Sequence, residues 1–277
     1  MRYNVWKRVG RIESEFRKAL EKLADLMNKI ARSAGSDQAL YVERMKQFQN
    51  SYQFEKFITS AVKRMVTPIE VGNQRTWREA ARKATRGRFL YRLLVQELRQ
   101  GTFRIIQNQV IENVSLIRTL PEDVAAKVVH DINEEALKGR RAKSIESIIR
   151  DKTDQHARAS ARLIARTEVS KTQTALTMAR SEQLGLRWYV WRTAMDGDRV
   201  RKSHRNMEDV LVNWNNPPSP EELVGEESVG TYHAGNIWNC RCYPEPLIEI
   251  DDVDWPHKVY MNGTIVKMKR SGFEKVM

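Results

Sequence analysis

Cysteine is scarce in this 277-residue chain, which holds only Cys240 and Cys242, separated by one residue. Two cysteines at that spacing make a poor disulfide framework, so we expect folding in a reducing cytosol. The sequence has no run of about 18 apolar residues, and we therefore expect no membrane-spanning helix. The first 16 residues lack an apolar stretch followed by a small-residue cleavage site, which is not typical of a secretory signal.

Motifs of several common enzyme classes are also missing. The sequence contains no Walker-type loop, no G-x-G-x-x-G and no H-E-x-x-H, so nothing indicates a nucleotide site or the usual zinc peptidase site. A Cys–His nucleophile pair, with His204 or His233 serving Cys240, remains conceivable, although no pattern supplies an oxyanion hole. We expect a protein that is not an enzyme.

Positive charge is unevenly distributed along the chain. Residues 1–180 hold 36 Lys and Arg against 20 Asp and Glu, a net charge of +16, whereas residues 181–277 hold 12 against 15, a net charge of −3. A basic part joined to a slightly acidic part indicates a polyanionic partner for the first and another partner for the second. The alternative is that the basic residues only solvate long helices.

Apolar residues recur every three or four positions through the first hundred residues, the period of amphipathic helices. The breaks at Gly35-Ser36-Asp37, at Pro68 and at Gly101 divide this region. The pattern predicts three long helices, over residues 3–32, 38–66 and about 74–99. Together they would form an elongated arm or bundle.

The third of these helices carries a basic row. Its members follow spacings of three and four residues and would share one face: Arg75, Arg78, Arg82 and Arg86, with Lys83 beside them. Arginine forms paired hydrogen bonds with phosphate oxygens, so the row predicts contact with double-stranded DNA without sequence preference. A solvated helix face is the alternative.

The next segment predicts three shorter helices and then a long one from Asp154 to Leu184. The long helix has a stripe of mostly small residues, which would allow a neighbour to approach closely. Glu168 lies on this stripe, and a buried carboxylate needs a cationic partner. We predict a structural ion pair of Glu168 with Arg199 or Arg201, rather than a catalytic acid.

From Trp188 the period changes to that of a strand, and Asn262-Gly263 predicts a type I′ hairpin near the end of the chain. The expected fold is a mainly α N-terminal helical arm or bundle, followed by a small α+β C-terminal domain with a terminal β-hairpin. We place the arm at residues 1–101 and the domain at 102–250, with helices to 185 and the α+β core from 186. The hairpin, residues 251–277, is expected to be a separate tail.

The α+β core contains four potential metal ligands: His204, His233, Cys240 and Cys242. Two imidazoles and two thiolates are the ligand set of a closed tetrahedral site, which predicts one structural Zn²⁺. The spacing is not that of a common zinc finger. The alternative is two buried cysteines that pack as small hydrophobes, with His204 hydrogen-bonded to Asp196 or Asp209.

An ordered set of motifs resembles a known family. It comprises ARTEVSKTQTA at residues 165–175, WRTAMDGDRVRKSH at 191–204, HAG at 233–235 and NCRC at 239–242. Over about residues 120–243 the chain resembles the Mu F-like minor head proteins, or head-morphogenesis proteins, of tailed phages. One departure follows His204, where RNMEDVLV stands in place of a segment that often contains glycine. Residues 1–100 and 251–277 lie outside the resemblance.

The resemblance implies a minor capsid protein that associates with the portal protein and other head proteins. It implies a role in head assembly or DNA delivery, and a place in the virion head after assembly in the host cytoplasm. The basic helices would then face the packaged DNA. The alternatives are a zinc- or cysteine-dependent hydrolase acting during assembly or infection, and a stand-alone nucleic-acid-binding module.

Overall fold

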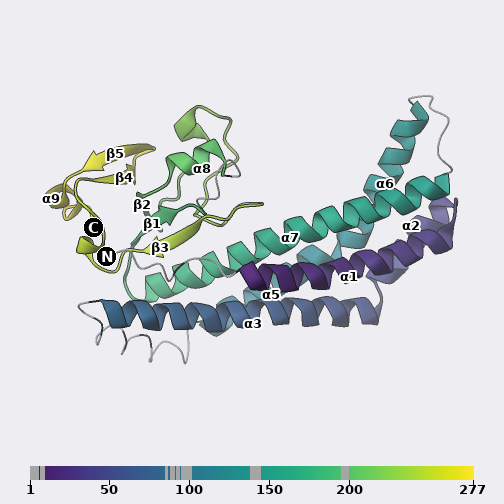
Figure 1. Cartoon of the computed structure of the whole chain (residues 1–277), viewed down its shortest axis with the longest axis horizontal. Helices are drawn as coiled ribbons and strands as arrows, with labels where there is room; N and C mark the ends of the chain where they lie inside the picture. The colour runs from purple at the N-terminus through teal and green to yellow at the C-terminus, as the bar shows by residue number, and fades with distance from the viewer. Residues whose placement is uncertain are drawn as a thin grey trace. The chain divides into compact units, whose positions relative to one another are not determined.

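The computed structural model describes residues 10–84, 102–137, 145–194 and 200–277, together with Trp6, Gly87, Tyr91 and Leu94. The chain divides into two compact units (Figure 1). The helical unit comprises residues 10–67 and 108–168, and the mixed unit comprises residues 1–9, 68–107 and 169–277. This division differs from the predicted boundary at residue 101, because two long helices, α3 (Tyr52–Lys83) and α7 (Ile145–Gln183), each contribute to both units.

The helical unit contains α1 (Gly10–Ala34), α2 (Gln38–Gln49), α6 (Leu120–Leu137) and parts of α3, α5 (Thr102–Arg118) and α7. Its core comes from the apolar stripes that the sequence predicts. On α1, for example, the buried side chains include Phe16, Leu20, Leu23 and Met27. None of the helices within the described residues is both long and apolar enough to cross a membrane.

Several predicted helix limits are wrong. The second predicted helix, over residues 38–66, is divided at Asn50-Ser51 into α2 and α3. The second predicted helix does not stop before Pro68, because α3 continues through this residue. Pro68 lies on the exposed face, whereas Met65, Val66 and Ile69 are buried, so packing keeps the chain helical despite the missing backbone hydrogen bond. The short and long helices expected on either side of residue 153 are a single helix, α7.

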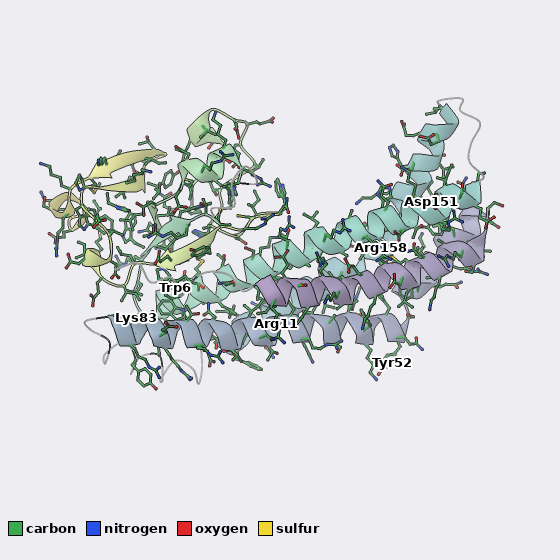
Figure 2. The ribbon with its side chains drawn as sticks, in the orientation of Figure 1. Trp6, Arg11, Tyr52, Lys83, Asp151 and Arg158 are labelled. Carbon is green, nitrogen blue, oxygen red and sulfur yellow. The ribbon has the colours of Figure 1, made fainter. Side chains whose placement is uncertain are left out.

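Polar contacts also join the helices of this unit. Arg158, which Figure 2 labels on α7, contacts Asp25 of α1 and Asp154 of its own helix, each at 2.8 Å. The hydroxyl groups of Tyr41 and Thr153 are 2.7 Å apart in the buried interior. Burial raises the pKa of Tyr41 to about 12, because the charged form would lose its hydration.

The mixed unit contains a five-stranded sheet with strand order β3-β1-β2-β4-β5. The strands are β1 (Trp188–Arg192), β2 (Val210–Asn213), β3 (Tyr243–Pro246), β4 (His257–Met261) and β5 (Thr264–Met268). β1 pairs antiparallel with β2 and β3, and β4 pairs antiparallel with β5, but β2 and β4 are parallel. The predicted fold class, helices followed by a small α+β domain, is confirmed.

The C-terminal hairpin forms where the sequence predicts it. Asn262 and Gly263 adopt φ values of 50° and 78°, as a type I′ turn requires, and Met261 pairs with Thr264. The hairpin is not a separate tail, however, because β4 pairs with β2 and extends the same sheet. Val259 is fully buried, which explains why this strand stays with the core.

Alternation along β1 sends side chains to two covered faces. Trp188 and Val190 belong to a cluster with Leu211, Val259 and Phe273 on one face. Tyr189 and Trp191 belong to the cluster on the other face, which also contains Cys240 and Cys242. The candidate site therefore lies in an aromatic-rich core beside the sheet.

Candidate metal centre

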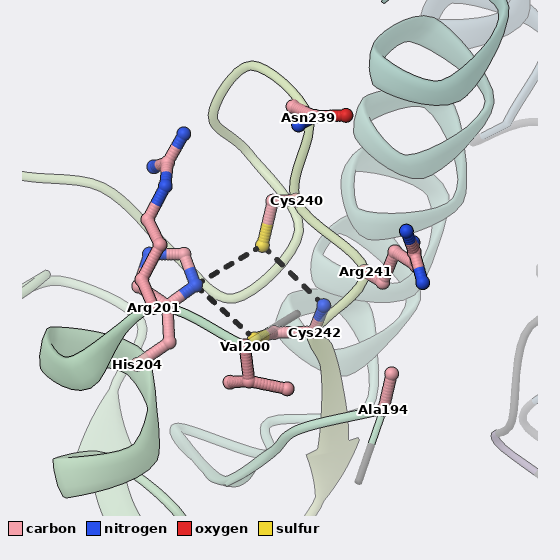
Figure 3. A pocket seen from close by; sticks show the side chains of 8 residues that line it. All are labelled: Ala194, Val200, Arg201, His204, Asn239, Cys240, Arg241 and Cys242. Carbon is pink, nitrogen blue, oxygen red and sulfur yellow. Dashed lines mark hydrogen bonds between the residues drawn. The ribbon is translucent and has the colours of Figure 1, made fainter. Parts of the chain in front are cut away.

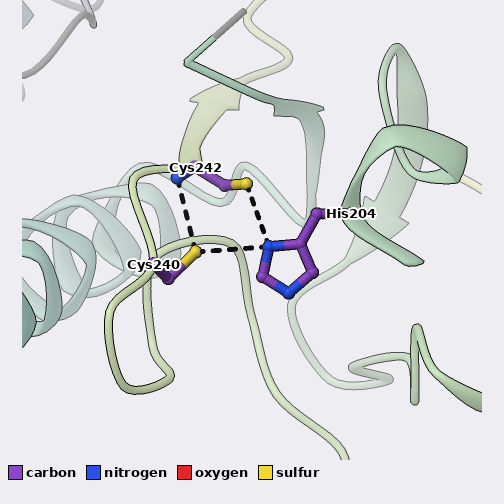
Figure 4. Close-up of side chains that lie close together, drawn as sticks. All are labelled: His204, Cys240 and Cys242. Carbon is purple, nitrogen blue, oxygen red and sulfur yellow. Dashed lines mark hydrogen bonds between the residues drawn. The ribbon is translucent and has the colours of Figure 1, made fainter. Parts of the chain in front are cut away.

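Three of the four predicted metal ligands lie together. His204 belongs to the short helix α8 (Lys202–Asn206), and Cys240 and Cys242 lie on the segment that leads into β3. The donor atoms of these three residues all lie within 4.8 Å of one another (Figure 4). Each side chain is only 3% exposed. Two chain segments separated by more than thirty residues thus meet at one buried point.

The distances within this group suit a tetrahedral metal ion. His204 Nδ1 lies 3.4 Å from Cys242 Sγ and 3.6 Å from Cys240 Sγ. With Zn–S and Zn–N bonds of about 2.3 and 2.0–2.1 Å, a tetrahedron has a nitrogen–sulfur edge of about 3.5 Å. The group could therefore hold a metal ion with little rearrangement of its side chains.

Backbone contacts fix the loop that carries the cysteines. Asn239 adopts φ +59°, and Gly235 adopts φ +84°. The hydroxyl of Thr174 on α7 donates to the carbonyl oxygen of Ala234 at 2.8 Å. The backbone N–H of Cys242 donates to Cys240 Sγ at 3.3 Å, which orients one sulfur toward the other residue's backbone.

The two thiols differ in acidity. The hydrogen bond with Cys242 is the largest influence on Cys240, and together with the neighbouring His204 it outweighs burial and holds the pKa of Cys240 well below its usual range. The hydrogen bond to Cys240, followed by burial, raises the pKa of Cys242. The pair therefore favours one thiolate and one thiol, and thiolates are the form that binds metal.

His233, the fourth predicted ligand, does not belong to this group. Its Nδ1 lies 3.2 Å from the hydroxyl of Tyr189, and its ring packs edge-on against Trp214 with centroids 5.2 Å apart. The imidazole is 8% exposed, and burial is the main cause that lowers its pKa to about 4. His233 is thus a buried neutral residue in the aromatic core.

This buried histidine should make the mixed unit sensitive to acid. The folded-state pKa of about 4 lies below the ordinary 6.5, so the unfolded chain binds an extra proton between these values. Stability is fully present above pH 6.5 and is lost as the pH falls toward 4, by about 3 kcal/mol from this group. Urea unfolding at pH 7 and pH 4.5 should show a smaller loss for His233→Gln than for the wild type. His130→Gln, which alters an exposed histidine on α6, is the control, and an equal loss in all three proteins would contradict the assignment.

A pocket of about 90 Å³ adjoins the group. Its walls include two guanidinium side chains, Arg201 and Arg241, with Asn239, Ala194 and Val200 (Figure 3). Arg201 donates to the carbonyl oxygen of Trp238 at 3.0 Å, and its guanidinium lies 5.6 Å from the centre of that ring. The pocket thus combines the metal-binding group with positive charge.

The predicted ion pair of Glu168 stays a prediction. Glu168 is buried, at 6% exposure, as its place on the inward stripe of α7 suggests. Arg199 lies outside the described residues, and the contacts described above for Arg201 are with Trp238.

A buried ionic group around Arg192 was not predicted from the sequence. Arg192 at the end of β1 contacts Glu245 of β3, and lies 2.5 Å from Asp209. Burial lowers the pKa of Arg192, but attraction to Glu245 and hydrogen bonds to Glu245 and Asp209 outweigh it and raise the pKa overall. Asp209 adopts φ +62°, so an aspartate supplies the left-handed turn after His204, in the segment where glycine is frequent in the family that the sequence resembles.

The predicted basic row lies on α3. Arg75, Arg78, Arg82 and Lys83 are exposed, and Lys83 forms an ion pair with Glu79 at 2.8 Å. The fifth member, Arg86, lies outside the described residues. The row is therefore accessible to a polyanion at three arginines of one helix face.

Comparison with known proteins finds a similarity over the segment that contains the candidate metal centre. A family model described as "Phage Mu protein F like protein" matches residues 126–244. A Haemophilus influenzae protein, described only as uncharacterized, is 30% identical over 159 residues, which are 57% of this chain and 31% of that relative. This chain thus spans less than a third of the relative's length. No solved structure matches the chain. Over residues 126–244, with His204, Cys240 and Cys242 among them, the chain is similar to the phage Mu F-like family.

Proposed function

We propose that this chain is a head-morphogenesis protein of a tailed phage. It would associate with the portal protein and other head proteins during assembly or DNA delivery, and it would reside in the virion head. The match of residues 126–244 to the Mu F-like family is the observation that carries this proposal. The wider chain supports a structural role, because it combines a unit of long helices with a mixed unit that contains a five-stranded sheet.

Counting the chain in purified, DNA-filled particles tests this role. Quantitative mass spectrometry should find this chain in far fewer copies than the major head protein, and chemical cross-linking of the same particles should join it to the portal. Absence of the chain from particles would contradict a virion component. Presence without any portal cross-link would contradict only the portal association.

We further propose that His204, Cys240 and Cys242 hold one structural Zn²⁺, with a water molecule in the fourth tetrahedral position. Two thiolates and an imidazole are ligands that zinc prefers, and the nitrogen–sulfur distances match a tetrahedral site. The ion would join α8 to the segment before β3. His233 is left out because its ring nitrogen faces Tyr189 in the aromatic core.

The basic row on α3 supports binding of double-stranded DNA without sequence preference. Replacing Arg75, Arg78 and Arg82 together by glutamine should lower the salt dependence of binding, because three phosphate contacts release about 2.7 counterions. The measurement is duplex affinity of the full-length chain against salt concentration. The slope of log K against log salt should therefore become shallower by about 2.7.

An equal loss of charge elsewhere is the control for this prediction. Lys18, Lys22 and Lys29 are exposed on α1, and their combined change to glutamine should leave the slope nearly unchanged. Equal effects of the two triple variants would show that net charge, and not the row, drives binding.

The lowered pKa of Cys240 beside His204 favours a second candidate, a cysteine-dependent hydrolase. The substitution His204→Ala separates the two functions. Loss of the general base leaves a folded but inactive hydrolase, whereas loss of a zinc ligand destabilises the mixed unit. A destabilised variant in thermal unfolding, with metal lost, supports the structural site.

A further inference from the structure

The Nε2 side of the His204 ring faces two buried polar side chains that are hydrogen-bonded to each other. Its Nε2 lies 3.0 Å from the hydroxyl of Tyr232, while its Nδ1 faces the two sulfur atoms. The same hydroxyl lies 2.7 and 2.8 Å from the two carboxylate oxygens of Glu221. Tyr232 and Glu221 are only 6% and 7% exposed. Two groups behind the imidazole are therefore held out of water.

Counting donors and acceptors shows which atom carries each proton in the series Glu221, Tyr232 and His204. A carboxylate only accepts, so the single hydroxyl proton of Tyr232 is donated to Glu221. The Tyr232 oxygen is then free to accept, and the group that faces it is the Nε2–H of His204. A neutral imidazole carries one proton, so Nδ1 keeps its lone pair, directed at Cys240 and Cys242.

Other contacts hold this arrangement in place. The hydroxyl of Ser203, itself 1% exposed, donates to Glu221 Oε1 at 3.1 Å. Glu221 lies just before a short 3-10 helix, η2 (Glu222–Val224), so a third chain segment contributes to the centre.

We propose that Glu221 and Tyr232 are positioning residues of the metal centre, which fix the tautomer and orientation of His204 so that it binds metal through Nδ1. This inference rests on the metal site proposed above. Metal-bound histidines in general donate their second ring N–H to such a partner, and loss of the partner typically weakens metal affinity 10–100-fold. Here the carboxylate of Glu221 acts through Tyr232. A change at Tyr232 removes the hydrogen bond to His204 directly, whereas a change at Glu221 alters the hydrogen bond that orients the Tyr232 hydroxyl.

Cobalt binding to the full-length chain tests the proposal, because Co²⁺ bound to thiolates gives a charge-transfer absorption. The wild type should bind one Co²⁺. Tyr232→Phe, which removes only the hydroxyl, and Glu221→Gln should each bind it about 10–100-fold more weakly while keeping the thiolate absorption. Glu222→Gln, at the exposed neighbouring position, is the matched control and should bind as the wild type does.

Nitrogen chemical shifts of His204 provide a measurement that a purely packing role would not change. The wild type should show a protonated Nε2 and a metal-bound Nδ1, and Tyr232→Phe without metal should show a mixture of tautomers. Variants that bind Co²⁺ as tightly as the wild type, or a metal-bound Nε2, would overturn the positioning role alone. A wild-type chain that binds no Co²⁺ would overturn the metal site and this inference together.

Discussion

Cys240→Ser is expected to release the metal ion and to lower the stability of the mixed unit by about 5 kcal/mol. This value lies below the apparent 10–16 kcal/mol, roughly, of zinc-finger peptides, because the mixed unit also has a core of its own. Trp191 and Tyr189 on β1, both fully buried, retain their packing when the metal is lost. For a unit of this size, the loss corresponds to a fall in Tm of about 10–20 °C. Differential scanning calorimetry with metal analysis of the same samples measures both quantities.

Chelation of the wild type provides the control, because it removes the ion without changing the side chain. A strong chelator should lower the Tm of the wild type to nearly that of Cys240→Ser, and it should leave the variant unchanged. The small remaining difference reflects the exchange of a buried sulfur for a hydroxyl. A wild type that contains no metal, with a Tm equal to that of the variant, would contradict the structural zinc.

Long periodic patterns in the sequence were sufficient to predict that the first part of the chain is helical, but not where each helix begins and ends. The centre of the predicted stripe of α1, Phe16, Leu20, Leu23 and Met27, is buried, because an amphipathic helix covers its apolar face against the core. The limit at Pro68 could not be predicted in the same way. A local rule ends the helix there, but the buried neighbours Met65 and Ile69 outweigh the lost hydrogen bond.

The side chains of the candidate metal centre could be named from the sequence, but which of the four lie together could not be predicted. Cys240 and Cys242 are separated by one residue, and His204 was singled out by its side-chain chemistry, so these three residues could be named. Whether His233 joins them depends on which ring neighbours it meets, and here it meets Tyr189 and Trp214. Tertiary packing decides where the His233 side chain lies, and the spacing of residues along the sequence does not show this.

The roles of Glu221 and Arg192 could not be predicted from the sequence, because they too depend on tertiary packing. Glu221 lies in a stretch rich in proline and glutamate that is typical of an exposed loop, yet its carboxylate is 7% exposed and bonded to Tyr232. Arg192 lies in an alternating strand and faces Glu245 on the neighbouring strand. In both cases one charged residue among many in the sequence is buried. Which one it is becomes clear only when the fold brings it next to its hydrogen-bond or ion-pair partner.

After Cys240→Ser, the largest loss of stability is expected when a methyl group is added at Gly235. A Cβ atom there would lie 2.6 Å from Thr174 Oγ1, 2.8 Å from the carbonyl oxygen of Cys242 and 3.0 Å from Ser170 Oγ. Gly235→Ala must therefore push the metal-binding loop away from α7, and its φ of +84° adds backbone strain. Overpacking and the left-handed conformation together should cost about 4 kcal/mol in the free energy of unfolding.

Gly225→Ala separates the two causes, because Gly225 has a φ of +75° but open space around its Cβ position. This control should cost only about 1 kcal/mol, the strain of the left-handed backbone. Urea unfolding measures both losses, and Co²⁺ titration should show weaker metal binding for Gly235→Ala alone, since only that substitution displaces Cys242. Equal losses in the two variants would mean that backbone strain alone requires glycine at position 235. A larger loss at Gly235 would instead show that the close approach of the loop to α7 sets the position of the second thiolate.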